Sequence, residues 1–275
     1  MTGEWVTVRV DPGGKPDAVL AALFAQGVQA VQEIAGGFAT SIPDPDGAAE
    51  LTTAVLEASP DATVHIVPGP IVDWTERWKA SIRAHDLGAI VVCPPWLAAG
   101  EDPNRRLIIE PAMAFGTGEH ETTRGVIRLM QGVVLAGDCV ADLGAGSAVL
   151  AIAAAMLGAR SVAAIELDHD AIGNAEANVE RNGVADRVTV IEGDAALLLP
   201  FVAPVRLITA NIISSVLLQI LPAIADALSS GGRAILSGIL TTEREEMMAA
   251  LTSSGWRAER EDTEGAWWSV LIARA

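Results

Sequence analysis

Two glycines and one carboxylate, Gly144, Gly146 and Glu166, have the types and spacing most able to do chemistry in this sequence. The glycines follow an apolar segment, V-A-D-L, and precede a helical pattern, A-V-L-A-I-A, so the chain can turn sharply and approach a ligand closely. The first turn of the following helix offers free backbone N–H groups. Glu166 ends a second apolar segment, S-V-A-A-I-E, where a carboxylate can accept from both ribose hydroxyls. Together they predict an adenine-nucleoside site.

The glycine spacing distinguishes between two kinds of nucleoside cofactor. An NAD loop would have a third glycine three positions after Gly146, where this chain has Val149. The pattern D-x-G-x-G from Asp142 instead resembles the first motif of class I methyltransferases, which bind S-adenosylmethionine. Their usual third glycine is Ala148 here, and we expect its methyl group to fit if the helix packs slightly farther from the strand. The pattern therefore favours S-adenosylmethionine over NAD.

The elements that must position these residues alternate along the second part of the chain. Apolar strand patterns are C-V-A-D-L, S-V-A-A-I-E, V-T-V-I-E-G-D, R-L-I-T-A-N-I and A-I-L-S-G-I, followed by W-R-A-E-R-E and W-S-V-L-I-A. Helical patterns fill most of the intervals. This order predicts an α/β fold, a Rossmann-like doubly wound sheet with an antiparallel last strand. The ligand is expected at the carboxyl ends of the strands, where the winding direction changes.

The first part of the chain has a different organisation. Residues 1–68 read as β-α-β-β-α-β, which predicts a small ferredoxin-like α+β domain. This domain lacks an obvious catalytic cluster, so we expect it to recognise the substrate, with a structural or oligomerising role as the alternative. Residues 69–88 predict a linker helix in which Trp74 and Trp78 pack against a domain. The methyltransferase-like domain is expected over residues 89–275.

Composition bounds the class of protein. The chain has 275 residues, 51% of them hydrophobic, and a mean hydropathy of +0.37, enough to bury a sizeable core. Its two cysteines, Cys93 and Cys139, lack metal-ligand spacing, so we expect neither a disulfide framework nor a metal site. The most apolar run, residues 148–157, is too short to span a membrane, and the N-terminus has no signal pattern. A cytoplasmic location is predicted.

Net charge bears on partners rather than on fold. The formal charge of −17 argues against nucleic acid as a direct partner, because tracking phosphates requires clustered Lys and Arg. An acidic surface suits a basic protein substrate, although many enzymes are acidic only for solubility. A monomer is the expected state.

Four further segments carry a family resemblance. They are E-P-A-M-A-F-G-T-G-E-H-E-T-T-R over residues 110–124, D-L-G-A-G-S-A-V-L-A-I-A, T-A-N-I and L-S-G-I-L. The chain resembles the PrmA family, bacterial methyltransferases that modify the ribosomal large-subunit stalk protein numbered eleven. The resemblance is strongest from Trp74 to Leu240. Family members usually have threonine and proline at the positions of Glu119 and Glu121, and commonly aspartate at that of Glu166.

The resemblance implies S-adenosylmethionine-dependent methyl transfer to amino groups of the stalk protein: lysine side chains, with the N-terminal amine as a further candidate. The cofactor contacts that it implies fall on Thr123, Gly144, Glu166 and Asn211. Thr123 would donate its hydroxyl to the methionine carboxylate, or alternatively cap the following helix. Asn211 is the candidate catalytic residue, since its carbonyl can accept from the acceptor amine without adding charge. The alternative for Asn211 is a structural bond at the strand end.

Three more residues complete the expected site. Gly146 belongs to the cofactor loop, and Asp194, after the third strand, is placed to accept from the adenine amino group. His120 is expected to orient its loop rather than bind a metal.

Two alternatives to the predicted function of the chain remain. One is methylation of another protein or a small molecule, and the other is a non-catalytic cofactor-binding or interaction protein.

Overall fold

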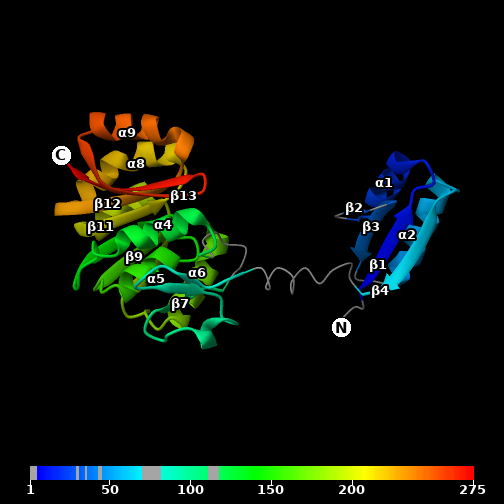
Figure 1. Ribbon diagram of the computed structural model, residues 1–275, viewed down its shortest axis with the longest axis horizontal. Coiled ribbons are helices and arrows are strands. Elements are labelled where there is room, and N and C mark those ends of the chain that lie inside the picture. The colour runs from blue at the N-terminus through cyan, green and yellow to red at the C-terminus, as the bar shows by residue number, and fades with distance from the viewer. Residues whose placement is uncertain (1–4, 29–30, 35, 43–44, 70–81, 111–117) are drawn as a thin grey trace. The chain divides into compact units, whose positions relative to one another are not determined.

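The computed structural model describes residues 5–28, 31–34, 36–42, 45–69, 82–110 and 118–275. The chain divides into two compact units, residues 1–81 and 82–275, drawn in Figure 1. Most of the predicted linker helix, with Trp74 and Trp78, lies outside the described residues. Its last part is not helical, because His85–Asp86 form strand β5, which pairs with β6 (Val91–Cys93).

The small unit is a four-stranded antiparallel sheet with two helices. Its elements are β1 (Val6–Asp11), α1 (Pro16–Ala25), β2 (Gln32–Ile34), β3 (Gly37–Ile42), α2 (Pro45–Ala58) and β4 (Thr63–Pro68). The strand order is β2-β3-β1-β4, and every pair is antiparallel. The buried side chains of Val8, Leu23 and Val55 join the sheet to the two helices. The element order is the β-α-β-β-α-β order read from the sequence.

The large unit is built on a seven-stranded sheet in the order β10-β9-β8-β11-β12-β14-β13. The strands are β8 (Cys139–Leu143), β9 (Ser161–Glu166), β10 (Val188–Glu192), β11 (Val205–Asn211), β12 (Leu228–Leu240), β13 (Trp256–Glu264) and β14 (Trp267–Arg274). The strands from β10 to β12 pair in parallel, whereas β14 is antiparallel to both of its neighbours. The predicted doubly wound sheet with an antiparallel last strand is confirmed.

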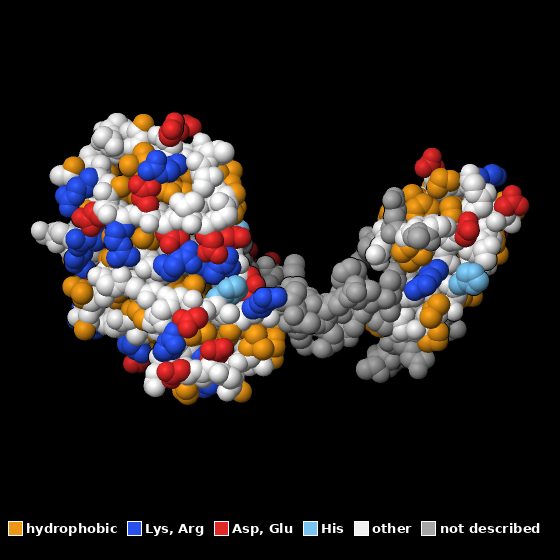
Figure 2. Space-filling view, viewed as in Figure 1, with side chains coloured by type: hydrophobic (Ala, Val, Ile, Leu, Met, Phe, Trp, Pro, Cys, Tyr) orange, Lys and Arg blue, Asp and Glu red, His pale blue; other side chains and the backbone are white. Residues whose placement is uncertain are grey.

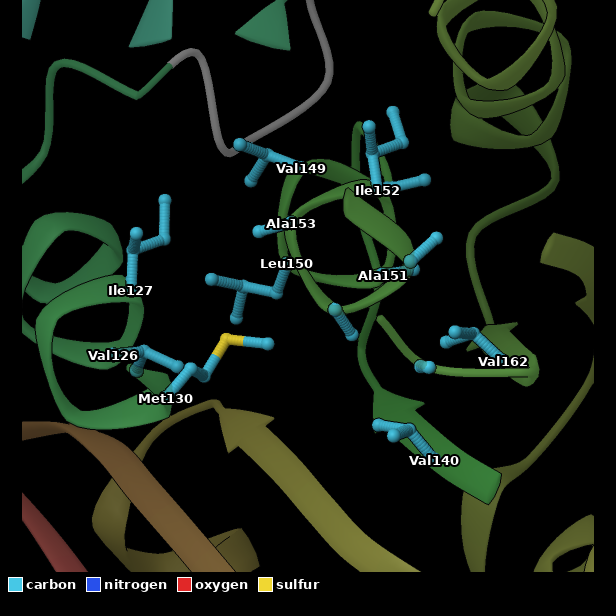
Figure 3. Close-up of a cluster of buried hydrophobic side chains, with 14 of the residues drawn as sticks. Val126, Ile127, Met130, Val140, Val149, Leu150, Ala151, Ile152, Ala153 and Val162 are labelled. Atoms are coloured by element: carbon cyan, nitrogen blue, oxygen red, sulfur yellow. The ribbon is translucent and has the colours of Figure 1, made fainter. Parts of the chain in front are cut away.

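Helices cover both faces of this sheet. They are α4 (Glu121–Met130), α5 (Val149–Met156), α6 (His169–Arg181), α7 (Ala195–Val202), α8 (Ser214–Ala227) and α9 (Arg244–Ser253). One buried cluster joins the sheet to α4, α5 and α6, and a second joins it to α7, α8 and α9. In Figure 3, Val126, Ile127 and Met130 of α4 face Leu150 and Ala153 of α5. The helices that follow β8 and β9 lie on one face of the sheet, and those that follow β10 and β11 lie on the other. The direction of winding therefore reverses between the neighbouring strands β8 and β11.

A small second sheet precedes the main one. Strand β5 pairs with β6, and β6 pairs in parallel with β7 (Arg106–Ile108). Asn182, the C-cap residue of α6, completes the free edge of β7, because its side-chain amide accepts from Ile108 N at 2.8 Å and donates to Ile108 O at 2.7 Å. Among the described residues, no helix has the length and apolarity needed to cross a membrane.

Candidate functional site

A pocket of about 490 Å³ opens at the carboxyl ends of β8, β9 and β11, where the winding direction changes. This is the position at which doubly wound sheets bind ligands, and the volume suits a small molecule. Its lining includes His120, Thr122, Thr123, Gly144, Gly146, Glu166, Asn211, Ile213 and Trp267. The structure thus brings together six of the seven predicted site residues: His120, Thr123, Gly144, Gly146, Glu166 and Asn211.

The glycine loop requires backbone conformations that favour glycine. Gly144 has φ +69°, and a Cβ there would lie 2.6 Å from the Ile212 Cγ2 atom. Gly146 has φ +52°. The N–H groups of Gly144 and Ala145 both donate to the Ile165 carbonyl, at 2.9 and 3.0 Å, which fixes the loop against β9. A side chain at Gly144 would therefore displace Ile212 from its place beside the pocket.

Ala148 also adopts a left-handed conformation, with φ +64° and ψ +18°, immediately before α5. Glycine is the usual residue in such a conformation because it has no Cβ to clash with the backbone. The fully buried methyl group of Ala148 is accommodated in the core, and a slightly larger distance between helix and strand stays a prediction. The presence of alanine instead of glycine at this position therefore affects the backbone torsion.

The Glu166 carboxylate is held by two backbone groups. Oε2 accepts from the Gly146 N–H at 2.7 Å, and Oε1 accepts from the Asp168 N–H at 2.8 Å. Each carboxylate oxygen has two lone pairs, so both can accept a further hydrogen bond from a ligand hydroxyl. Glu166 is thus fixed at the pocket wall and simultaneously ties the glycine loop to the end of β9.

Asp142 is a fully buried carboxyl group behind the glycine loop that sequence reasoning used only as the start of a motif. Thr209 donates its hydroxyl to Oδ1 at 2.7 Å, and the Ala151 N–H donates to Oδ2 at 3.1 Å. Burial raises the pKa of Asp142 to about 7, and the nearby Glu166 charge adds to this rise. Asp142 therefore joins β8 to β11 and to the first turns of α5.

Thr123 does not cap a helix, so that alternative is wrong. Helix α4 begins at Glu121, and the capping residue is His120, whose Nδ1 accepts from the Thr122 N–H at 3.3 Å. Thr123 lies in the first turn of α4, is completely buried, and lines the pocket. Its hydroxyl oxygen has no hydrogen-bond partner among the described residues. A buried hydroxyl without a partner is costly and points to a ligand group that would complete it.

Asn211 is linked to His120 through Thr122. The Asn211 Nδ2 donates to Thr122 Oγ1 at 3.1 Å, and Thr122 Oγ1 lies 2.8 Å from His120 Nδ1. Since His120 Nδ1 already accepts from the Thr122 N–H, the hydroxyl is assigned as a donor to the same nitrogen, which places a neutral histidine's proton on Nε2. The His120 ring meets Trp267 edge to face, with ring centroids 4.9 Å apart.

Asp194 is the predicted site residue that is not among the pocket-lining residues. Its carboxylate caps α7, accepting from the N–H groups of Ala196 at 2.7 Å and Leu197 at 3.3 Å. Trp267 is one of the lining residues that sequence reasoning missed, because nothing in β14 marks one of two adjacent tryptophans as facing a site. No group of three or more metal-ligating side chains occurs in the described part of the chain.

The two glutamates that depart from the family pattern have partners of their own. Glu119 Oε1 lies 3.0 Å from His85 Nε2. Glu121 lies 3.9 Å from the Arg124 guanidinium, which also binds Glu264 at 2.6 Å. Glu119 therefore connects the start of α4 to β5, whereas Glu121 shares, within α4, the arginine that binds Glu264 of β13.

The parallel strands, the antiparallel β14 and the glycine loop beside Glu166 define a class I methyltransferase fold. The family model described as ribosomal protein L11 methyltransferase (PrmA) matches residues 27–275. The chain therefore belongs to the ribosomal protein L11 methyltransferase family, and it is a methyltransferase.

Individual relatives agree with this assignment. The L11 methyltransferase of Thermus thermophilus is 40% identical over 201 residues, covering 73% of this chain and 76% of that protein. The one from Pelotomaculum thermopropionicum is 36% identical over 256 residues, covering 92% and 77%. The crystal structure of a ribosomal protein L11 methylase from Lactobacillus delbrueckii subsp. bulgaricus superposes with a TM-score of 0.62 at 29% identity, covering 70% of this chain and 99% of that one.

Proposed function

We propose that this enzyme transfers methyl groups from S-adenosylmethionine to amino groups of ribosomal protein L11, namely lysine side chains and the N-terminal amine. The choice of acceptor rests on the names of the relatives. The observation that carries the choice of cofactor is the unpartnered Thr123 hydroxyl in a pocket that Glu166 also lines. A hydroxyl donor and a carboxylate in one pocket suit a ligand with both an amino-acid part and a ribose.

The residues of the pocket fit the parts of this cofactor. Gly144 and Gly146 leave room for its close approach, and Glu166 has lone pairs for the ribose hydroxyls. Thr123 would donate to the methionine carboxylate. We also retain Asp194 as a proposed contact to the adenine amino group, in addition to its role as the cap of α7. The cofactor supplies a methyl group already activated by its positively charged sulfur, so the protein needs only to hold and align the acceptor.

Asn211 is the residue that we propose to hold the acceptor amine. Its Nδ2 is engaged by Thr122, which leaves the carbonyl oxygen of the same side chain as the group for the incoming N–H. An attacking amine must be neutral, with its lone pair directed at the methyl carbon. Fixed alignment of this kind supplies several kcal/mol, with about 7 to 11 as the upper range. The proton released from the amine passes to solvent at the pocket mouth.

The test is radiolabelled methyl transfer to purified L11, combined with calorimetric titration of S-adenosylmethionine. We expect cofactor binding and methylation by the unaltered enzyme, and retained folding with at least about a tenfold loss of turnover in Asn211→Ala. Wild-type turnover in that variant would remove Asn211 from the mechanism. Cofactor binding with transfer only to other acceptors would favour methylation of another substrate, and no cofactor binding would favour an interaction protein.

The small unit is proposed to recognise the protein substrate. Ile66 of edge strand β4 is 47% exposed, an apolar side chain that a partner could cover. Ile66→Lys should raise the KM for L11 without changing cofactor affinity, whereas Ala49→Lys adds the same charge on α2 and should not. Equal KM values in both variants would favour a structural role for this unit. A monomeric state, a cytoplasmic location and the absence of a direct nucleic-acid partner stay predictions.

A further inference from the structure

A second cavity, of about 420 Å³, lies at the opposite end of strand β12 from the cofactor pocket. The cofactor pocket reaches β12 at Gly238, whereas the second cavity surrounds the start of the strand, from Leu228 to Arg233. The two cavities share no lining residue. The second cavity therefore takes no part in the proposed methyl transfer.

The lining of this cavity is positively charged in an acidic protein. It contains Arg233, Arg257 and Arg274 but only one carboxylate, Glu259. The difference of three positive charges and one negative charge gives a lining of net charge +2, while the whole chain carries −17. Figure 2 shows Lys and Arg side chains gathered at the left end of the large unit, where Figure 1 marks the C-terminus.

Contacts hold the three guanidinium groups in place. Glu259 accepts from Arg233 Nε at 2.5 Å through one oxygen and from Arg257 Nη2 at 2.7 Å through the other. Arg257 Nη1 also donates to the Arg274 carbonyl at 3.1 Å. Arg274 stacks over the buried Trp256 ring at 5.0 Å and donates to Ser254 O.

These contacts leave donors for a ligand. Each guanidinium has five N–H donors, and the contacts above engage only part of them. The two oxygens of Glu259 are each already bound to an arginine, so this carboxylate does not oppose an incoming anion with a free charge. The pKa of Glu259 is lowered by the same two arginines, so the carboxylate remains ionised at neutral pH.

A serine–glycine bulge near the start of β12 completes the cavity wall. Ser229 and Ser230 precede Gly231, which has φ +68°, and Gly232, where a Cβ would lie 2.9 Å from the Ser229 carbonyl. This bulge places two hydroxyl-bearing residues, Ser229 and Ser230, in the lining of the same cavity as the arginines. Hydroxyl and guanidinium donors that converge are the groups by which proteins bind oxyanions.

We propose that this cavity binds a phosphate group. A phosphate monoester carries about −1.5 to −2 charge at neutral pH, which matches the +2 of the lining, and its oxygens accept from several arginines at once. A carboxylate carries half of that charge and two oxygens, so it would leave the cavity with a net positive charge. The ligand class is thus inorganic phosphate or a phosphate monoester.

The test is NMR of the full chain with ¹⁵N-labelled arginine at constant ionic strength. Inorganic phosphate and methyl phosphate are titrated separately, with acetate as the monoanion. We expect saturable shifts of the Arg233, Arg257 and Arg274 Nε–H signals with phosphate, at concentrations at least about tenfold lower than acetate requires. Saturation by methyl phosphate identifies a monoester as a ligand, and saturation by inorganic phosphate alone identifies the free ion.

Two variants complete the design. Arg257→Gln should weaken phosphate binding at least about tenfold, whereas Arg244→Gln removes an arginine that pairs with Glu261 outside the cavity and should not. Methyl transfer should be unchanged in both. Linear, non-saturating shifts, equal shifts of the Arg244 signal, or undiminished binding in Arg257→Gln would overturn the proposal.

Discussion

The backbone N–H of Gly146 donates a 2.7 Å hydrogen bond to the Glu166 carboxylate. This bond joins the glycine loop after β8 to the last residue of β9, and both residues line the pocket. The position of the loop and the position of the proposed ribose acceptor are consequently set together. A substitution at either residue should therefore shift the position of the other.

Glu166→Gln should weaken binding of S-adenosylmethionine by about 10- to 100-fold, because a neutral amide has one acceptor oxygen for two backbone N–H donors. Isothermal titration calorimetry measures the affinity. Glu192→Gln is the matched control, since Glu192 of β10 is the register neighbour of Glu166 in the sheet but does not line the pocket. Equal affinities in the two variants would contradict a ribose role for Glu166.

Thr123→Val should leave the fold as stable as before or stabilise it by about 1 kcal/mol, because the buried hydroxyl that it removes has no partner among the described residues. Cofactor affinity should nevertheless fall. Thermal unfolding and calorimetric titration separate the two effects. Thr122→Val is the comparison variant, since it loses the bonds to His120 and Asn211 and should lower the stability. A Thr123→Val variant with unchanged cofactor affinity would speak against Thr123 as a ligand.

The raised pKa of the buried Asp142 carboxyl group leads us to expect a particular pH dependence of the protein's stability. Its folded pKa of about 7 lies above the ordinary value of 3.8, so the folded state holds the proton more tightly than the unfolded chain does. The contribution of Asp142 to the free energy of unfolding is therefore full below about pH 4 and declines as pH rises to about 7, by an amount on the order of 4 kcal/mol.

Asp142→Asn should abolish this decline. The asparagine can still accept from Ala151 N–H and can donate to Thr209 Oγ1, so both contacts are retained. Urea unfolding between pH 5 and 8 should show the variant gaining stability relative to the unaltered protein as pH rises. Parallel stability profiles across this range would show that Asp142 titrates as an ordinary carboxylate.

Ala148→Gly should change the free energy of unfolding by less than about 1 kcal/mol. Relief of the left-handed torsion gains about 1 to 2 kcal/mol, whereas added backbone entropy of the unfolded chain costs about 0.5 to 1 and the lost buried methyl about 0.8. Ala148→Val should lose several kcal/mol, because a β-branched side chain is strained at this φ. Denaturant unfolding measures both. A large gain from glycine would mean that the alanine methyl contributes nothing to the core.

The sequence predicted the parts of the site that are local in the chain. Gly144, Gly146 and Glu166 belong to one strand–loop–helix–strand segment, so their spacing alone indicated their proximity. The bond from Asn211 to Thr122 joins residues 89 positions apart, and Trp267 comes from β14. Such contacts depend on strand order and tertiary packing, which periodicity does not encode.

Two polar residues near helix starts have surroundings that residue type alone did not indicate. Thr123 was a reasonable helix cap by residue type, but His120 takes that role because the helix begins earlier. Asp194 was placed correctly after its strand, yet its carboxylate is turned to the N–H groups of α7. Residue type allows either side chain to cap a helix or to contact a ligand, and the exact start of the helix decides which backbone N–H groups each can reach.

The place of β14 in the sheet has a consequence for the enzyme's biosynthesis. This strand lies between β12 and β13 and brings Trp267 to the pocket, against the ring of His120. A nascent chain that has folded β8 to β12 already has the glycine loop and Glu166, but it lacks this wall. The pocket is therefore assembled only when β14 has emerged from the ribosome and inserted beside β12.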